Sequence, residues 1–301
     1  MYISIMRIFV CVLLVLLAGN VNAQTKSGAL VFNKDDNSLL WEISGNGLKK
    51  PSYLFGTFHL MCKEDIHFSN QLKTAFENAS EIYMELDMDD PSAVASAISQ
   101  MNMKGGHKLK DFYSDSEYKR IDKYFSDSLG LSLNVFQDFK PYFLIAAMYT
   151  KMLTCKSISG VEEELVQLAK QDKKKIEGLE TIEFQSSVFD TIPYGEQAKE
   201  LLKSIDSLDE NRKEFLDMLN IYKNQEISKI EGMFEKNEFG IDDHEDILVD
   251  NRNKNWIEQL KTIMKNEPVF IAVGTGHLVG DNGLIALLRK KGYKLRPLFN
   301  R

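Results

Sequence analysis

The same short pattern, G-T-x-H, ends two apolar stretches that lie near opposite ends of this 301-residue chain. Residues 53–60 read Y-L-F-G-T-F-H-L, and residues 271–278 read I-A-V-G-T-G-H-L. Short apolar runs that end in turn residues are typical of strands covered on both faces of a sheet. The repetition predicts that the two strands are neighbours in one sheet, so that His59 and His277 meet at the same edge.

The other strand signals also lie toward the two ends of the chain, whereas the middle is mainly helical. A hairpin is expected from residues 29–32 and 38–43, and single strands are expected at 81–88, 173–177 and 293–297. Apolar residues at helical spacing predict helices at 70–79, 142–153, 162–170 and 198–219, a helix that opens at 252–256, and one that starts after the N-cap Asp281 and ends before Gly292.

This order of elements predicts an α/β (α+β) fold in which one sheet is built from N- and C-terminal strands around a large, mostly helical middle insertion. We expect one domain over residues 24–301. Its N-terminal sheet half is 24–91, its helical middle is 92–266 and its C-terminal sheet half is 267–301. A hydrophobic content of 44% is enough for a substantial core.

Residues 1–23 have the layout of a secretory signal peptide. They contain one basic residue, Arg7, then an apolar run at 8–18 and a small-residue ending before Gln24. We therefore expect an exported protein, periplasmic or secreted. An uncleaved membrane anchor is the alternative, although the apolar run is short of the roughly 20 residues that a spanning helix needs.

Charge and cysteine content narrow the function classes further. The formal net charge of −7 argues against a nucleic-acid partner. Only Cys62 and Cys155 remain once the expected leader is removed. A bridge between them and a pair of buried thiols are both compatible with the sequence.

The two histidines are the leading candidates for chemistry. One G-T-x-H alone would favour a structural histidine after a turn glycine, but two matched copies favour a metal site or acid–base pair. Glu85 is the third candidate. It lies on the polar side of the 81–88 strand with Asp87, and a right-handed crossover would bring that strand end beside His59. Two histidines and a carboxylate form a known hydrolytic metal set.

Other polar residues have weaker signals. Arg252 opens R-N-x-x-W and is either an exposed arginine beside a buried tryptophan or a group that stabilises an oxyanion. His67 is a weak candidate for a supporting role. His107 and His244 lie in stretches with the composition of loops.

Six motifs taken together resemble the TraB/GumN family, which is related to the Tiki proteins. In chain order these are L-F-G-T-F-H-L, Y-M-E-L-D, F-K-P-Y-F, I-E-G-L-E-T-I-E-F-Q, R-N-K-N-W and V-G-T-G-H-L-V-G-D-N-G-L. The resemblance implies a two-halved α/β fold with a helical middle and, in the Tiki branch, a divalent-metal-dependent peptidase. One departure is Gly160-Val161-Glu162, where the family commonly has G-x-D.

Carried onto this chain, the resemblance makes His59, His277 and Glu85 the metal ligands for Mn, Co or Zn. Glu85, Arg252 and Asn253 are then the catalytic candidates. The residues expected to support them are Gly56, Thr57, Gly274, Thr275, Asp87 and Glu180.

Two classes of function follow. The first is a divalent-metal-dependent, peptidase-like hydrolase. The second is an exported protein that binds a peptide, pheromone, haem or other small ligand without turnover, although the chain has no C-x-x-C-H haem attachment motif.

Overall fold

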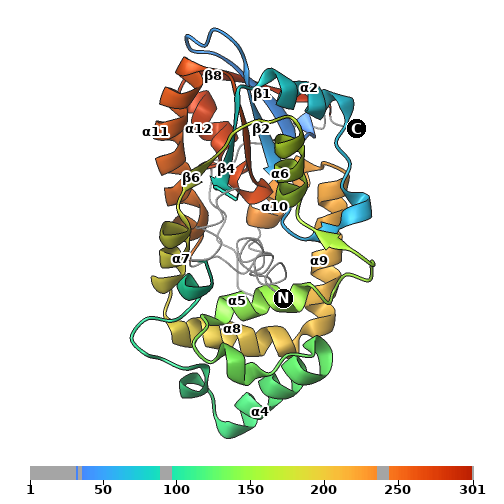
Figure 1. The fold of residues 1–301 in the computed structure, drawn as a ribbon, viewed down its shortest axis with the longest axis vertical. Helices are drawn as coiled ribbons and strands as arrows, with labels where there is room; N and C mark the ends of the chain where they lie inside the picture. Colours follow the sequence, from blue (N-terminus) through green and yellow to red (C-terminus); the bar gives the residue numbers. More distant parts are fainter. Residues whose placement is uncertain (1–31, 33–35, 89–96, 236–243, 300–301) are drawn as a thin grey trace.

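The computed structural model describes residue 32 and residues 36–88, 97–235 and 244–299. Figure 1 shows a sheet with flanking helices toward one end of the molecule and a group of helices toward the other. The expected leader, residues 1–23, lies outside the described residues. Over the described part of the chain, no helix combines the length and the apolar character needed to cross a membrane.

Six strands form one mixed sheet in the order β6-β4-β7-β2-β1-β8. They are β1 (Leu40–Gly45), β2 (Ser52–Thr57), β4 (Glu81–Leu86), β6 (Ile176–Glu180), β7 (Val269–Gly274) and β8 (Tyr293–Leu298). Neighbouring strands from β6 to β2 are parallel, while β1 pairs antiparallel with both β2 and β8. The predicted α/β class is therefore confirmed, with one strand of the sheet, β6, coming from the helical middle.

The two strands that carry the repeated motif are neighbours. β2 and β7 pair in parallel with Leu54 opposite Ile271 and Thr57 opposite Gly274. Every residue of both strands is buried, which explains why their sequences are apolar rather than alternating. The predicted adjacency of the two strand ends is confirmed.

Three helices pack close to the sheet: α2 (Asn70–Asn78), α11 (Asn251–Asn266) and α12 (Leu284–Lys290). α2 contacts β7 through Phe76 and Phe270, whose ring centroids are 5.2 Å apart. α11 and α12 lie side by side (Figure 1). Arg252 is the second residue of α11 and contacts Glu85 in β4 and Glu180 in β6. The first turn of α11 therefore lies at the ends of these strands.

Seven α-helices of the helical middle lie between residues 115 and 235. They are α4 (Asp115–Tyr124), α5 (Pro141–Tyr149), α6 (Val161–Gln171), α7 (Ile182–Asp190), α8 (Tyr194–Asp206), α9 (Leu208–Lys223) and α10 (Ile227–Glu235). All nine residues of α5 are buried, and α5 packs against α8. Lys140, just before α5, is buried because its ammonium group contacts Asp190 at 2.9 Å and the Ser186 hydroxyl at 2.8 Å.

Several expected elements differ from the structure. The hairpin consists of β1 and β2. Of its expected first arm, Phe32 is not in a strand and residues 29–31 lie outside the described residues. The helix expected at 198–219 is two helices, because Ser207 leaves the helical conformation (φ −114°, ψ 38°).

The break at Ser207 is stabilised from both sides. Asn211 donates a hydrogen bond to the Ser204 carbonyl at 3.1 Å, which satisfies the end of α8. Acidic residues in the first turn of α9 favour a new helix start. Two smaller corrections concern α12, whose N-cap is Gly283 rather than Asp281, and β6, which spans Ile176–Glu180 rather than 173–177 because these are the residues that pair with β4.

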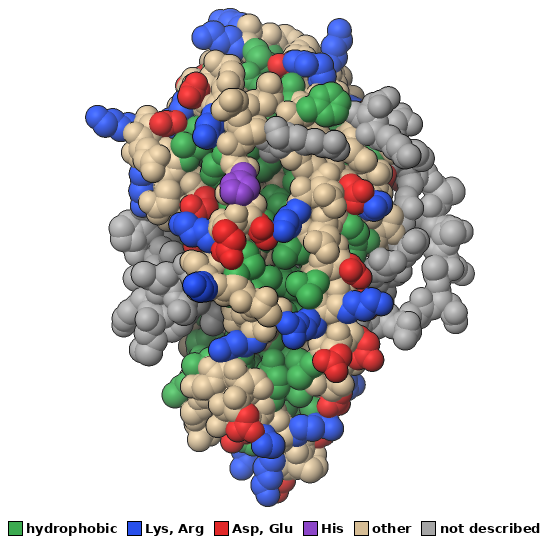
Figure 2. Space-filling view, turned by 90° about the vertical axis from the view of Figure 1, so that its right-hand side faces the viewer, with side chains coloured by type: hydrophobic (Ala, Val, Ile, Leu, Met, Phe, Trp, Pro, Cys, Tyr) green, Lys and Arg blue, Asp and Glu red, His purple; other side chains and the backbone are tan. Residues whose placement is uncertain are grey.

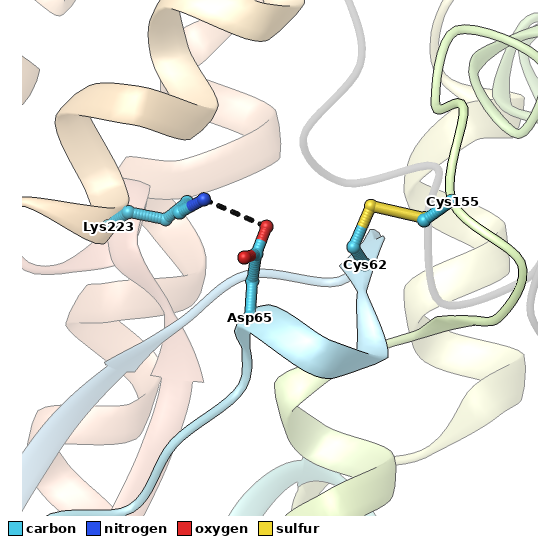
Figure 3. Close-up of a disulfide and its surroundings, with 4 residues drawn as sticks. All are labelled: Cys62, Asp65, Cys155 and Lys223. Atoms are coloured by element: carbon cyan, nitrogen blue, oxygen red, sulfur yellow. Dashed lines mark ion pairs between the residues drawn. A yellow bond between two sulfur atoms is a disulfide. The ribbon is translucent and has the colours of Figure 1, made fainter.

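A second, two-stranded sheet pairs β3 (Met61–Cys62) with β5 (Ile158–Ser159). Beside it, Cys62 and Cys155 form a disulfide with their Cα atoms 5.8 Å apart, and Figure 3 shows this bond close to the Asp65–Lys223 ion pair, whose N···O distance is 2.8 Å. The structure thus selects the bridge over a pair of buried thiols. Elsewhere the surface has mixed charge: on the face shown in Figure 2, acidic and basic side chains are interspersed.

Candidate active site at the ends of two neighbouring strands

His59 follows β2 and is buried against the start of α6. Its Nδ1 lies 2.5 Å from Glu162 Oε1, as a close ion pair rather than an aligned hydrogen bond. Because the Val161 amide donates to the Phe58 carbonyl at 3.0 Å, the first turn of α6 is held against the strand end. Burial alone would lower the pKa of His59, but the Glu162 carboxylate raises it above its ordinary value.

His277 lies in the turn after β7 and is held in one tautomer. Its Nδ1 lies 2.7 Å from Asn253 Oδ1. The Asn253 amide group donates in turn to the carbonyls of His277 and Asn282, at 3.3 and 2.9 Å, which fixes its orientation. The oxygen can only accept, so Nδ1 carries the proton and Nε2 the lone pair. Burial and the nearby Arg252 charge lower the pKa of His277 to about 3.

Glu85 is the fifth residue of β4, the strand next to β7, and its carboxylate is buried against the end of β7. Oε1 accepts the Gly274 amide at 2.8 Å, and Oε2 accepts Arg252 at 2.7 Å and Gln185 at 3.2 Å. His277 Nε2 is 3.9 Å from Oε1. Burial would raise the pKa of Glu85, but Arg252, the two histidines and the Gly274 amide together lower it to about 2.

Arg252 connects these groups. Its Nη1 meets His277 Nε2 at 3.1 Å, and its Nε donates to Glu180 Oε1 at 3.0 Å. The side chain is 1% exposed and lies over the Trp256 ring, 4.9 Å from its centre. Of the two alternatives for Arg252, the exposed arginine beside a buried tryptophan is therefore excluded. Burial raises the pKa of Glu180, although Arg252 acts in the opposite direction.

Glu85 Oε1 and His59 Nε2 face the space beside Gly274, and the His277 ring borders it. A Cβ atom built on that glycine would lie 3.2 Å from Glu85 Oε1, 3.5 Å from His59 Nε2 and 3.8 Å from His277 Cδ2. Next to this point is a cavity of about 20 Å³, which is room for about one water molecule or one ion. Its lining residues are His59, Met84, Glu85, Leu86, Met88, Glu162, Gln185 and Ala272.

The residues that the sequence analysis expected to support the site differ in what their side chains contact. Thr275 uses its hydroxyl to bond the Thr57 carbonyl at 2.8 Å, so it ties the two motifs together instead of holding its own turn. The Thr57 hydroxyl has no hydrogen-bond partner among the described residues. Gly56 lies against Thr275. Asp87 follows the end of β4 and is half-buried.

Two residues of the site were not among the expected ones. Glu162 contacts His59, and the sequence signal for it was the Gly160-Val161-Glu162 stretch at which the resemblance departs from G-x-D. Gln185 bridges Glu85 and Glu180, at 3.2 and 3.0 Å. It lies in the I-E-F-Q part of a quoted motif, but nothing in its spacing connects it to Glu85.

The remaining histidines lie elsewhere. His67 is exposed and lines a separate groove at the N-terminal end of α2. His107 packs against Phe112 and Tyr194, and His244 lies 3.5 Å from Glu196. The weak expectation that His67 supports the site is therefore wrong.

Comparison with known proteins gives similar proteins over most of the chain. Metalloprotease TIKI1 of Danio rerio is 21% identical over 351 residues, which covers 95% of this chain and 68% of that protein. The match to TIKI2 of the same species covers 62% of its length, so about a third of each relative lies outside the match. No solved structure matches the chain significantly.

Bacterial proteins match over more of their own length. An uncharacterized protein of Treponema pallidum (strain Nichols) is 21% identical, with 94% of this chain and 90% of that protein covered. The uncharacterized protein YbaP of Shigella flexneri is 24% identical, with 79% and 88% covered. The sequence pattern of one family spans residues 39–297, which includes every strand of the main sheet apart from the last residue of β8. By this match the chain belongs to the TraB/PrgY/gumN family.

Proposed function

We propose that this protein is a divalent-metal-dependent hydrolase of peptide or amide bonds, with His59, Glu85 and His277 as the metal ligands. The metalloprotease names of the TIKI relatives support the reaction class. One observation carries the assignment of the site. Each imidazole is held at Nδ1 by an oxygen atom, from Glu162 or Asn253, which is the arrangement that presents Nε2 to a metal ion.

The charge states of the donors suit a divalent ion. At neutral pH, the low pKa of His277 keeps the ring neutral and the low pKa of Glu85 keeps its carboxylate ionised. His59 is paired with Glu162, and ion binding at Nε2 requires that nitrogen to give up its proton while Nδ1 keeps its own. When bound, such an ion acidifies water and polarises a carbonyl group.

Arg252 has a separate role in this proposal. It contacts Glu85 at Oε2 and His277 at Nε2, so ion binding at Nε2 of His277 requires that contact to be given up. Glu180 holds the guanidinium through Nε as well, which gives Arg252 an anchor that does not depend on the metal ligands. From that anchor, the released N–H groups stabilise the negative charge that develops on an attacked carbonyl.

A second candidate function is favoured by the same arginine. Arg252 already pairs with Glu85 and occupies the lone pair of His277, so both groups have a partner without an ion. In that case the protein binds a peptide or small ligand without turnover. Haem is the least suitable ligand, because a cavity of about 20 Å³ is far below the few hundred Å³ of typical ligand pockets.

The test is cleavage of a peptide library by chelator-stripped protein covering residues 24–301, with Mn²⁺, Co²⁺ or Zn²⁺ added back. Metal-stimulated cleavage should fall at least 100-fold in H59A, H277A and E85Q. The matched control is H67A, which removes an exposed histidine outside the site and should cleave like the parent. Tight peptide binding with no ion bound and no cleavage would select the second candidate instead.

A further inference from the structure

We infer that the Cys62–Cys155 disulfide positions the His59–Glu162 pair, and that its reduction by a dithiol uncouples them. This role rests on the proposed function, because Glu162 orients one of the proposed ligands. Cys62 follows His59 by three residues, and Cys155 precedes Glu162 by seven. The bridge therefore joins the two segments whose side chains meet at 2.5 Å.

The non-covalent contacts between these segments include the Val161–Phe58 hydrogen bond, a Lys63–Glu164 ion pair at 2.7 Å and one short sheet. In that sheet, β3 and β5 are two residues long each and pair Met61 with Ser159 and Cys62 with Ile158. The Lys63 amide donates to the Ser157 carbonyl at 2.9 Å, beyond the end of that ladder. Without the disulfide, the covalent path from Cys62 to Cys155 runs along the chain, in which the two residues are 93 positions apart.

The contact between His59 and the start of α6 also leaves little room for either segment to move. A Cβ atom on Gly160 would lie 2.7 Å from the His59 carbonyl oxygen, so the start of α6 sits directly on the backbone of the histidine. A shift of about 1 Å is enough to impair a catalytic geometry. We therefore expect the His59–Glu162 contact to depend on the distance between the two segments, which the short sheet and the disulfide maintain.

The chemistry of release is ordinary thiol–disulfide exchange. One thiolate of a dithiol attacks a cysteine sulfur, breaks the S–S bond and forms a mixed disulfide, which the second thiol resolves. Two electrons and two protons pass to the protein, leaving two cysteine thiols and an oxidised dithiol. Both cysteines are half-buried rather than enclosed in the core, so a small dithiol has access to the bond.

The experiment compares oxidised parent protein, C62S/C155S and E162A, each covering residues 24–301 with ¹⁵N-labelled histidine. Contact with Glu162 in a buried site slows exchange of the His59 Nδ1 proton with water, so we expect its ¹⁵N–¹H signal in the parent only. The His277 Nδ1 proton, held by Asn253 at 2.7 Å, is the internal control and should remain visible in all three proteins.

Affinity for Mn²⁺, measured by calorimetry, is the second readout. It should fall roughly 10- to 100-fold in both variants, as is usual when the partner of a metal-bound histidine is lost. Serine replacements are used instead of reduction because the sulfur atoms of Cys62 and Cys155 and a carboxylate oxygen of Glu64 lie within 4.8 Å of one another. Once reduced, these three residues could bind the ion themselves.

Two results would overturn the positioning role. In the first, C62S/C155S keeps the His59 signal. In the second, that variant loses the His277 signal and its circular dichroism as well, which would mean that the disulfide holds the whole fold. If the parent binds no Mn²⁺, the proposed function fails, while the comparison of the two histidine signals still decides the role of the disulfide.

Discussion

The guanidinium of Arg252 contacts two buried carboxylates and one imidazole, and so competes with any cation for the same donors. Its contacts with Glu85 and Glu180 are those of a buried ion network, in which removing one partner leaves the others uncompensated. Arg252 should therefore stabilise the ion-free protein and weaken its affinity for metal.

Replacing Arg252 by Ala should lower the free energy of unfolding of ion-free protein by about 3–5 kcal/mol. Adding Mn²⁺ should then stabilise R252A more than it stabilises the parent, because a competing positive charge is gone. The matched control is R296A, which breaks an exposed ion pair with Glu42 and should cost less than about 1 kcal/mol. Urea unfolding with chelator or Mn²⁺ measures both effects. An equal response of R252A and parent to Mn²⁺ would contradict competition.

The lowered pKa of His277 gives stability a defined pH dependence. Its folded value of about 3 lies below the ordinary 6.5, so between these values the unfolded chain takes up a proton that the native ring refuses. Stability is therefore lost as pH falls, by up to about 1.4 kcal/mol per pH unit. Glu85 acts in the same direction at lower pH: its contribution is present above 4.5 and lost as pH falls toward about 2.

The pH range from 6.5 to 4.5 separates the two groups, because only His277 contributes to this loss there. Over that range, H277Q should lose less stability on acidification than the parent. H67Q, which removes an exposed histidine, should follow the parent. Urea unfolding at half-unit pH steps gives the slopes, and parallel slopes for H277Q and parent would refute the assignment.

At the scale of elements, the two copies of the motif place their glycines in different surroundings. A Cβ on Gly56 would meet Thr275 Oγ1 at 2.9 Å and Leu278 Cδ2 at 3.1 Å, so this glycine allows the two strand ends to pack together. A Cβ on Gly274 would instead enter the space between the donors. One glycine therefore serves the fold and the other serves the site.

Substitution by alanine should separate these roles. G274A should lower Mn²⁺ affinity about 10-fold or more while changing the free energy of unfolding by about 1 kcal/mol, since the added Cβ would lie no closer than 3.2 Å to any neighbouring side-chain atom. G56A should cost about 1–3 kcal/mol through overpacking and leave the affinity of the folded protein unchanged. Calorimetry and urea unfolding measure the two quantities, and normal metal binding by G274A would argue against the site.

The elements that the sequence predicted are those with a local signal. The apolar runs of β2 and β7 and the repeated motif predicted their adjacency, and the alternation in β4 predicted which side of the strand carries Glu85. The division between α8 and α9 was missed because Ser207 is a neutral choice within a helix and no glycine or proline marks the break. Helical periodicity continues across it.

The candidate site was predictable only in part. The strand ends located His59, Glu85 and His277, but the partners of these residues depend on packing between distant segments. Glu162 reaches His59 because α6 starts on the end of β2, and Gln185 reaches Glu85 because α7 follows β6. The buried network around Arg252 likewise combines residues from three parts of the chain, whose contacts no local spacing encodes.

At the scale of the whole molecule, the disulfide and the expected leader point to the same compartment. Disulfides persist in oxidising environments such as the periplasm and the extracellular space, and are rare in the cytosol. The Cys62–Cys155 bridge therefore agrees with the export that residues 1–23 predict. The site at the strand ends depends, in the proposal above, on chemistry that only an oxidising compartment maintains.

We predict that the protein isolated from the periplasm or medium begins at Gln24 and has Cys62 and Cys155 bridged. Protein produced in the cytosol without residues 1–23 should carry two free thiols and bind Mn²⁺ at His59, Glu85 and His277 roughly 10- to 100-fold more weakly, until oxidation restores both properties. N-terminal sequencing, thiol alkylation with mass spectrometry and calorimetry make the comparison. A C62S/C155S protein is the control, because oxidation should leave its affinity unchanged. Recovery of Met1 from exported material would contradict cleavage before Gln24. Equal Mn²⁺ affinity of reduced and oxidised protein would show that metal binding at the site does not depend on an oxidising compartment.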